Sequence, residues 1–226
     1  MVLYYFLLVC LDLERVCKKL LLILCLFCFS FLLFFFFEVC TDVHLPYIYL
    51  SFQGTIANAL LERLLEVAEE RKVTLLDGDH VRHHLSSELG FSREHRDINI
   101  KRIGYVSSEI AKHGGMAVCA AIAPYSEARN EARRLVEEAN GRFVEVFVNT
   151  PLSHCEKRDR KGLYAKARAG TLKGMTGIDD PYEEPQECEI DLPSHELTVA
   201  ESVDRIMDFL ASKGYIHLPG HPLKEE

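Results

Sequence analysis

The sequence lacks an excess of positive charge, which limits the partners that can be expected for it. Its 226 residues carry 26 lysines and arginines against 34 aspartates and glutamates, a formal net charge of −8. A broad basic face for nucleic acid is therefore not expected, and no nucleic-acid partner is predicted, although a small positive pocket is compatible with this balance. The length suffices for one α/β domain with a well-buried core.

Cysteines are scarce outside the first 40 residues. Of the eight cysteines, only Cys119, Cys155 and Cys188 lie in the body of the chain. No pair among them has the spacing of metal ligands, so the sequence predicts no certain metal-binding residue. Three scattered cysteines suit a reducing compartment, where they pack as small apolar groups, and a cytoplasmic location is expected for the body.

Residues 1–46 differ in composition from the rest of the chain. Residues 20–37 form an apolar run with Ser30 as its only polar member, just long enough as a helix to cross a bilayer core. Basic residues precede the run and acidic residues follow it, so a spanning helix would leave the N-terminus in the cytoplasm. Three other interpretations stay open: a signal peptide that lacks a small-x-small cleavage site, a buried apolar extension, and non-coding sequence translated through a wrong gene model.

From residue 47 onward, short apolar runs alternate with segments of helical periodicity, which predicts a parallel sheet covered by helices on both faces. Strands are expected at 47–52, 73–76, 116–123, 142–148 and 189–192, and helices at 55–71, 80–87, 95–113, 126–140, 198–212 and from 151. Thr55 and Ser126 are expected to cap their helices, and Gly114 to end one. The predicted domain covers 47–216. Residues 157–187 would form a mobile lid over a site, and 217–226 a polar tail.

Charged side chains follow the second predicted strand, at the edge of the sheet where ligands bind in such folds. Asp77 and Asp79 could accept a proton from a substrate hydroxyl or hold a Mg²⁺ water. Arg82 and Arg96 would neutralise anionic groups, with Arg102 as a further candidate, and Asn99 would supply an orienting hydrogen bond. The alternative is a simple turn in which Asp79 caps the next helix.

The sequence lacks a phosphate-binding loop, and this absence has the largest consequence for function. Such a loop needs the pattern G-x-x-x-x-G-K-S/T between the first strand and the first helix, so that backbone N–H groups wrap the phosphates and the lysine bridges them. The chain has Ser51-Phe52-Gln53-Gly54-Thr55 at this place, with one glycine and no lysine. The motif does not occur in the sequence.

From about Tyr47 to Ile216 the sequence closely resembles the adenylyl-sulfate kinase (APS kinase) family. The residues that carry the resemblance are Thr55 to Leu60, Asp77 to Arg82, Phe91 and Ser92 with Arg96, Asn99, Ile100 and Arg102 to Gly104, Ile122 to Tyr125 with Arg129, Ala132 and Arg133, Cys155 to Asp159, Lys161 to Tyr164, Lys166 to Gly170, and Gly177 to Tyr182. The resemblance implies a P-loop kinase-type three-layer fold with a mostly parallel five-stranded sheet and a mobile lid. It does not extend to residues 1–46.

The resemblance also implies an activity: transfer of the γ-phosphoryl group of ATP, with Mg²⁺, to the 3′-hydroxyl of adenosine 5′-phosphosulfate (APS), which gives the sulfate donor PAPS. A homodimer and a functional link to ATP sulfurylase are implied with it. The implied catalytic residues are Asp77 and Asp79, the implied substrate-binding residues are Arg82, Phe91, Arg96, Asn99, Ile122, Ala123, Lys166 and Asp179, and the implied nucleotide or lid residues are Thr55, Arg158, Lys161 and Arg168.

The sequence departs from the family pattern at three places. The phosphate-binding loop is missing, Met175 stands where the lid often carries phenylalanine, and Ala123 stands where some members carry a serine that can be phosphorylated. Two rival hypotheses therefore stay open. One is a catalytically inactive substrate-binding or regulatory homologue, and the other is a different small P-loop kinase acting on a nucleoside or a sugar.

Overall fold

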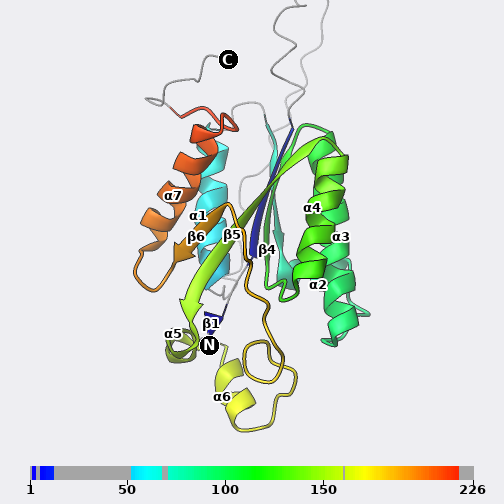
Figure 1. The fold of residues 1–226 in the computed structure, drawn as a ribbon, viewed down its shortest axis with the longest axis vertical. Helices are drawn as coiled ribbons and strands as arrows, with labels where there is room; N and C mark the ends of the chain where they lie inside the picture. Colours follow the sequence, from blue (N-terminus) through cyan, green and yellow to red (C-terminus); the bar gives the residue numbers. More distant parts are fainter. Residues whose placement is uncertain (1, 4–5, 13–51, 68–70, 160, 219–226) are drawn as a thin grey trace, which may run out of the picture.

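The computed structural model of the chain describes residues 2–3, 6–12, 52–67, 71–159 and 161–218, which form a six-stranded sheet flanked by helices (Figure 1). The strands are β1 (Val2–Leu3), β2 (Phe6–Asp12), β3 (Val73–Asp77), β4 (Met116–Ala121), β5 (Gly141–Pro151) and β6 (Ile190–Pro193). The helices are α1 (Phe52–Val67), α2 (Gly78–His84), α3 (Arg93–Lys112), α4 (Ser126–Glu138), α5 (Leu152–Arg158), α6 (Leu163–Arg168) and α7 (Val199–Ser212).

The strands lie in the order β1-β5-β2-β4-β3, and β6 also pairs with β5. β3 is parallel to β4 and β5 is parallel to β6, whereas β2 runs antiparallel to both β4 and β5. Because β4 and β5 both oppose β2, the strands β3 to β6 all point the same way. The predicted α/β fold with a mostly parallel sheet is therefore confirmed, but the sheet has six strands in the described part of the chain, not five.

Strand β2 belongs to the stretch 1–46, which the sequence predicted to lie before the domain. β2 lies in the middle of the sheet, with Leu8 opposite Cys119 on one side and opposite Glu145 on the other. Its sequence is almost entirely apolar, which is typical of a strand that is paired along both edges. Its last residue, Asp12, pairs with Gly141, the first residue of β5, so β2 ends far from the carboxyl ends of β4 and β5.

Residues 47–51 of the strand predicted at 47–52, and the apolar run at 20–37, lie outside the described residues. Phe52, the last residue of that predicted strand, begins α1 instead. Within the part of the chain that the structure describes, no helix is both long and apolar enough to cross a membrane.

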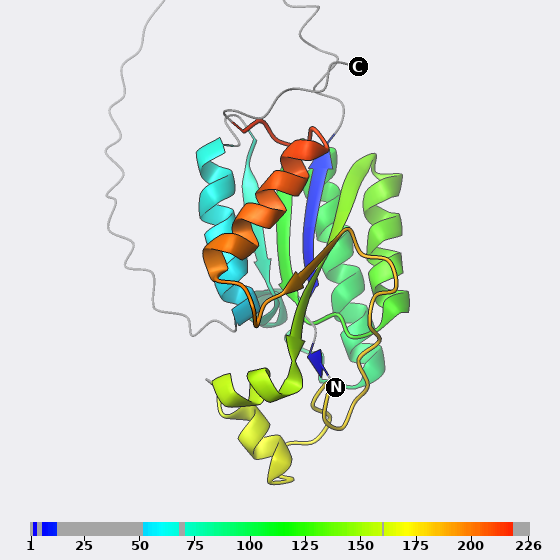
Figure 2. The ribbon, with the colours of Figure 1, turned by 60° about the vertical axis from the view of Figure 1, so that its left-hand side comes forward.

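Helices cover both faces of the sheet: α1 and α7 lie on one face, and α3 and α4 on the other (Figure 1, Figure 2). The alternation of side chains along β4 supplies both cores. Val118 and Ala120 pack with α1 and α7, whereas Ala117 and Cys119 pack with α3 and α4. All six residues of β4 are buried, as predicted for a central parallel strand.

Two helix starts differ from the prediction. α1 begins at Phe52, so Thr55 lies inside its first turn and does not cap it. α4 begins at Ser126 itself, and the capping acceptor is the carboxylate of Glu183, 57 residues later, which accepts from Ser126 N at 2.8 Å and from Ser126 Oγ at 2.6 Å. The end of α3 agrees with the prediction, because Gly114 follows it in the left-handed region (φ +80°) that favours glycine.

Candidate active site

A cavity of about 600 Å³ opens at the carboxyl ends of β3 and β4, and the segment that follows β5 lines it as well. This edge of the sheet is where the sequence predicted a site, because parallel strands deliver their following residues to one place. The predicted residues in its wall are Asp77, Asp79, Arg82, Phe91, Arg96, Asn99, Ile122, Ala123, Arg158 and Lys161. The structure thus brings together residues from two strand ends, two helices and the predicted lid.

The two carboxylates after β3 have different surroundings. Asp77 is the N-cap of α2, and its Oδ1 accepts from the backbone N–H groups of Asp79 at 2.9 Å and His80 at 3.3 Å. Asp79 Oδ2 lies 2.5 Å from the ammonium group of Lys161, which belongs to the predicted lid. The alternative in which Asp79 caps the helix is therefore wrong, since Asp77 does so, and the Asp79 carboxylate is left to face the cavity.

Two arginines lie near the exposed ring of Phe91. The guanidinium carbon of Arg82 lies 4.5 Å from the ring centroid and that of Arg96 lies 5.8 Å from it, while the Phe91 residue is 63% exposed. Burial, together with the positive charge of Arg96, lowers the pKa of Arg82 from its ordinary value. The wall therefore combines concentrated positive charge with an aromatic surface, which suits an anionic ligand with a flat ring.

The guanidinium of Arg96 donates its hydrogen bonds to other groups of the chain. Its Nε donates to Phe91 O at 2.8 Å, Nη1 donates to Thr176 Oγ1 at 2.6 Å, and Nη2 donates to Gly174 O at 2.6 Å. The sequence predicted that this guanidinium binds a substrate anion. In the structure it joins α3 to the lid, so anion binding by Arg96 stays a prediction that requires some of these contacts to exchange.

Asn99 offers an acceptor that the described residues do not satisfy. The residue is 4% exposed, lies in the cavity wall, and its Oδ1 has no hydrogen-bond partner within the described part of the chain. A buried carbonyl oxygen without a partner is costly in a folded protein, unless a ligand or water supplies the donor. Asn99 therefore fits the orienting role predicted for it.

The segment after β5 covers the cavity and has a small core of its own. Leu152, Cys155 and Tyr164 pack together, and Met175 and Ile178 pack against them. Burial raises the pKa of the Cys155 thiol to about 11, so this cysteine is an apolar packing residue and not an ionised nucleophile. Met175, which stands where the family often has phenylalanine, lies in the cavity wall.

Four predicted residues do not reach the cavity wall: Thr55, Lys166, Arg168 and Asp179. Arg168 Nη2 donates to Glu156 Oε1 at 2.6 Å in an exposed contact, and Asp179 Oδ2 accepts from Gly174 N at 3.0 Å within the lid loop. Thr55 lies on α1, two residues beyond the wall residue Gln53. Binding roles for these four residues stay predictions.

Sequence reasoning missed several wall residues, among them Gln53, Thr150, Tyr164 and Thr176. Thr150 could have been found, because it lies near the carboxyl end of a predicted parallel strand. Gln53 and Thr176 carried no such signal. Gln53 is placed by its amide, which donates to Ala121 O at 3.0 Å, and Thr176 by its contact with Arg96, and both partners are remote in sequence.

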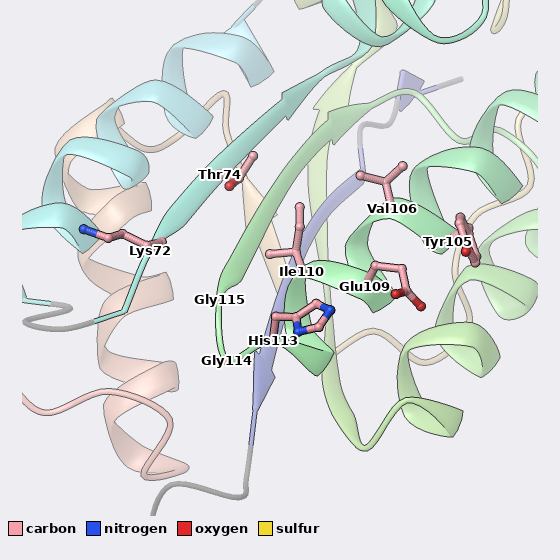
Figure 3. A pocket seen from close by; sticks show the side chains of 9 residues that line it. All are labelled: Lys72, Thr74, Tyr105, Val106, Glu109, Ile110, His113, Gly114 and Gly115. Atoms are coloured by element: carbon pink, nitrogen blue, oxygen red, sulfur yellow. The ribbon is translucent and has the colours of Figure 1, made fainter.

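A second cavity, of about 540 Å³, lies near the opposite end of β3 and β4 and contains none of the predicted site residues. Figure 3 shows that Glu109, Ile110 and His113 on and just after α3 gather there beside the Gly114–Gly115 turn. Its wall residues lie at the amino ends of β3 and β4 and toward the carboxyl end of α3, whereas Asp77 and Asp79 follow the carboxyl end of β3. This cavity is therefore separate from the candidate active site.

Comparisons with known proteins agree on one family. The family model described as adenylylsulphate kinase matches residues 43–193. The adenylyl-sulfate kinase of Microcystis aeruginosa is 49% identical over 165 residues, which cover 73% of this chain and 88% of that protein. The sulfate adenylyltransferase of Aspergillus fumigatus is 50% identical over 165 residues, but the match covers only 29% of that protein.

Two solved structures give the same result. The APS kinase of Mycobacterium tuberculosis in complex with AMPPNP and APS is 38% identical, with a TM-score of 0.67 over 70% of this chain and 90% of that one. A hexameric APS kinase from Thiobacillus denitrificans is 40% identical, with a TM-score of 0.56 over 74% of this chain and 27% of that one.

Proposed function

Because this chain belongs to the adenylyl-sulfate kinase family, we propose that it transfers the γ-phosphoryl group of Mg-ATP to the 3′-hydroxyl of adenosine 5′-phosphosulfate and forms PAPS. The observation that carries the proposal is a single cavity wall that holds the Asp79 carboxylate, the Arg82 guanidinium, the unsatisfied Asn99 oxygen and the Phe91 ring. These groups complement a hydroxyl, an anionic phosphosulfate and an adenine ring, which are the parts of APS.

Asp79 is the group best placed to accept the proton of the substrate hydroxyl. Both carboxylates line the cavity, but Asp77 Oδ1 is held by two backbone N–H groups as the cap of α2, whereas Asp79 Oδ2 contacts the side chain of Lys161 in the lid. As the oxygen of the 3′-hydroxyl forms its bond to the γ-phosphorus, its proton passes to Asp79 and the bond from the γ-phosphorus to the bridging oxygen of ADP breaks. A positioned carboxylate contributes about a hundredfold to ten-thousandfold to such transfers.

Positive charge for the transferring group comes from the lid as well as from the sheet edge. Arg158 and Lys161 lie in the cavity wall together with Arg82, and transfer of this kind depends mainly on positioning and charge neutralisation. Asp79 also fits a role as Mg²⁺ ligand, because Mg²⁺ with a nucleotide takes one or two protein carboxylates and this side chain is 68% exposed. When bound with ATP, Mg²⁺ neutralises charge on the phosphate oxygens.

The decisive experiment incubates the full chain with ATP, MgCl₂ and APS and measures PAPS and ADP by ion-exchange chromatography. Equal amounts of PAPS and ADP are expected, and omission of APS should abolish ADP formation. The Asp79→Asn variant serves as the matched control that keeps the shape of the side chain. A chain that folds and binds APS, yet forms no PAPS, would contradict the proposed activity.

Binding of APS without transfer is the second candidate function, and two observations favour it. The stretch before α1 has no G-x-x-x-x-G-K-S/T pattern, and β2 ends beside Gly141, at the opposite edge of the sheet from the cavity. For this function, calorimetry on the full chain should detect APS binding and no binding of Mg-ATP. Micromolar binding of Mg-ATP would argue against it.

The family also suggests partners and a location. We propose a homodimer. Light scattering during size-exclusion chromatography would distinguish it from a hexamer, the assembly of the related structure from Thiobacillus denitrificans. A functional link to ATP sulfurylase is supported by the related sulfate adenylyltransferase, which contains a matching region. Cys119, Cys155 and Cys188 are free thiols, which supports a reducing compartment.

A further inference from the structure

The loop between β4 and α4 contains a strained residue at the cavity. Ile122 and Ala123 both lie in the cavity wall, and Ala123 has φ +42°, a value in the left-handed region that residues with a Cβ avoid. Such backbone persists only where the surrounding structure enforces it. Whatever holds Ala123 in this conformation therefore also shapes the wall against which APS would bind.

Arg129 on α4 is the side chain that holds this loop. Its Nη1 donates to Ala123 O at 2.9 Å, and its Nη2 donates to Glu183 O at 2.8 Å, in the segment by which the chain returns from the lid. One rigid, planar guanidinium thus binds two carbonyl oxygens that lie 60 residues apart in the sequence. The side chain is 2% exposed, so water does not compete for these contacts.

The sheet holds Arg129 in place. Glu145 on β5 places its Oε1 2.9 Å from Arg129 Nε, and its side chain is 7% exposed. Burial raises the pKa of Glu145, and the charges of Arg129 and Arg133 oppose this change. Removing one partner of such a buried pair leaves the other charge uncompensated, so the position of Arg129 is strongly determined.

The end of the lid is tied to the same loop by its own contacts. Glu183 N donates to Pro124 O at 2.8 Å, and the Glu183 carboxylate accepts from Ser126 N and Oγ. Residues 122–126 and Glu183 therefore form one connected unit around Arg129. Asp180, three residues before Glu183, has its Oδ2 3.6 Å from Nη2 of the wall residue Arg96.

We propose that Arg129 is a positioning residue that keeps the β4–α4 loop and the returning end of the lid in the one arrangement that binds APS. It lies outside the cavity wall and acts through Ala123 and Glu183. This inference rests on the proposed function for the identity of the ligand, whereas the connection between the two segments is a property of the free chain.

The test compares Arg129→Lys with Arg133→Lys in the full chain. Lysine keeps the positive charge but lacks the planar fork that donates to Ala123 O and Glu183 O at once. Arg133 is the matched control because it lies one turn further along α4 in the same charged cluster, and its partners are Glu137, Glu145 and Glu189. Loss of general stability alone would affect both variants in the same way.

The first readout is hydrogen exchange of the free chain in residues 121–126 and 180–186. Arg129→Lys should speed exchange in both segments together by about tenfold, and Arg133→Lys should not. The second readout is calorimetry, in which Arg129→Lys should bind APS about tenfold more weakly, with unchanged affinity for Mg-ATP if the chain binds it. A third variant, Arg129→Lys with Ala123→Gly, should regain part of the APS affinity, because glycine accepts the positive φ.

Unchanged exchange in Arg129→Lys, or an equal rise in Arg133→Lys, would overturn the inference. A rise in exchange without any loss of APS affinity would overturn it too. If Arg129→Lys fails to fold, Glu145→Gln takes its place and should shift both readouts in the same direction by a smaller factor. If the unmodified chain does not bind APS, the proposed function fails, while the exchange comparison still decides whether Arg129 joins the two segments.

Discussion

The ammonium group of Lys161 lies 2.5 Å from Oδ2 of Asp79, so the lid reaches across the cavity to the carboxylate that follows β3. The side chains of the pair are 39% and 68% exposed, so the contact contributes about 1 kcal/mol or less to stability. The main effect of the contact is therefore on the candidate site, where it places a positive charge beside the proposed proton acceptor.

Asp79→Asn should separate catalysis from folding. The melting temperature should stay within about 1 °C of the unmodified chain, because Asp79 is exposed, whereas PAPS formation should fall by about a hundredfold or more. Asp77→Asn is the matched control, because its side chain keeps an oxygen that can cap α2, and a smaller loss is expected. Equal losses in the two variants would contradict the assignment of Asp79 as the proton acceptor.

Arg96→Lys should loosen the lid. The guanidinium binds Phe91 O, Thr176 Oγ1 and Gly174 O at once, which a single ammonium group cannot do. Trypsin should therefore cleave after Lys166, Arg168 and Lys173 faster in the variant, as measured by mass spectrometry over time. Arg102→Lys is the control, since Arg102 bonds to Leu85 O and Glu88 and not to the lid. Equal cleavage rates in both variants would show that Arg96 does not secure the lid.

Gly104→Ala should destabilise the chain, although alanine is normally the better helix residue. A Cβ at position 104 would lie 2.8 Å from both Cα and Cβ of Ala132, so α3 and α4 would have to move apart. A loss of about 1–3 kcal/mol is expected in urea unfolding. Tyr105→Ala, at the next position and 59% exposed, should change stability by about 0.5 kcal/mol or less. An unchanged or raised stability for Gly104→Ala would mean that the two helices tolerate the extra methyl group.

Glu183→Gln should make stability less dependent on acid pH. The hydrogen bond from Ser126 Oγ, with a second from Ser126 N, lowers the pKa of Glu183 from its ordinary value. A lowered pKa means that the ionised form stabilises the folded chain above the ordinary glutamate pKa, and that this contribution is lost as the pH falls through the folded pKa. The variant should melt about 2 °C lower at pH 7, and this difference should shrink as the pH falls below the ordinary glutamate pKa.

Glu187→Gln is the control for this measurement, because Glu187 lies exposed in the same segment. The melting temperature of Glu187→Gln should equal that of the unmodified chain over the range of pH in which Glu183→Gln is measured. A difference for Glu183→Gln that stays constant between about pH 7 and about pH 3 would show that the carboxylate charge is not what caps α4.

The candidate site was largely predictable because its residues come directly after strands whose patterns are strong and local. The apolar run of β4 and the Asp77-Gly78-Asp79 turn after β3 are both read directly from sequence, and parallel strands bring the residues at their carboxyl ends to one edge of the sheet. Lys166, Arg168 and Asp179 were harder to place, because a segment with little apolar pattern does not indicate which of its charged residues face inward.

The cap of α4 and the anchor of Arg129 were not predictable. Ser126 looked like a local cap, but Glu183 supplies the acceptor, and Arg129 is held by Glu145 on another strand. These contacts join residues far apart in the chain, and only folding decides which of many arginines and glutamates meet.

Periodicity and dense motifs are local properties, so the order of amino acids alone was enough to establish the α/β class and the family. The positions of the strand ends also indicated the edge of the sheet that carries the candidate site. Three other features required the folded chain: the antiparallel place of β2 in the middle of the sheet, the division of roles between Asp77 and Asp79, and the link that Arg129 makes between the β4–α4 loop and the end of the lid. The physical reason is that strand order and buried charge pairing depend on which distant segments pack together, and the free energy of that packing belongs to the whole fold.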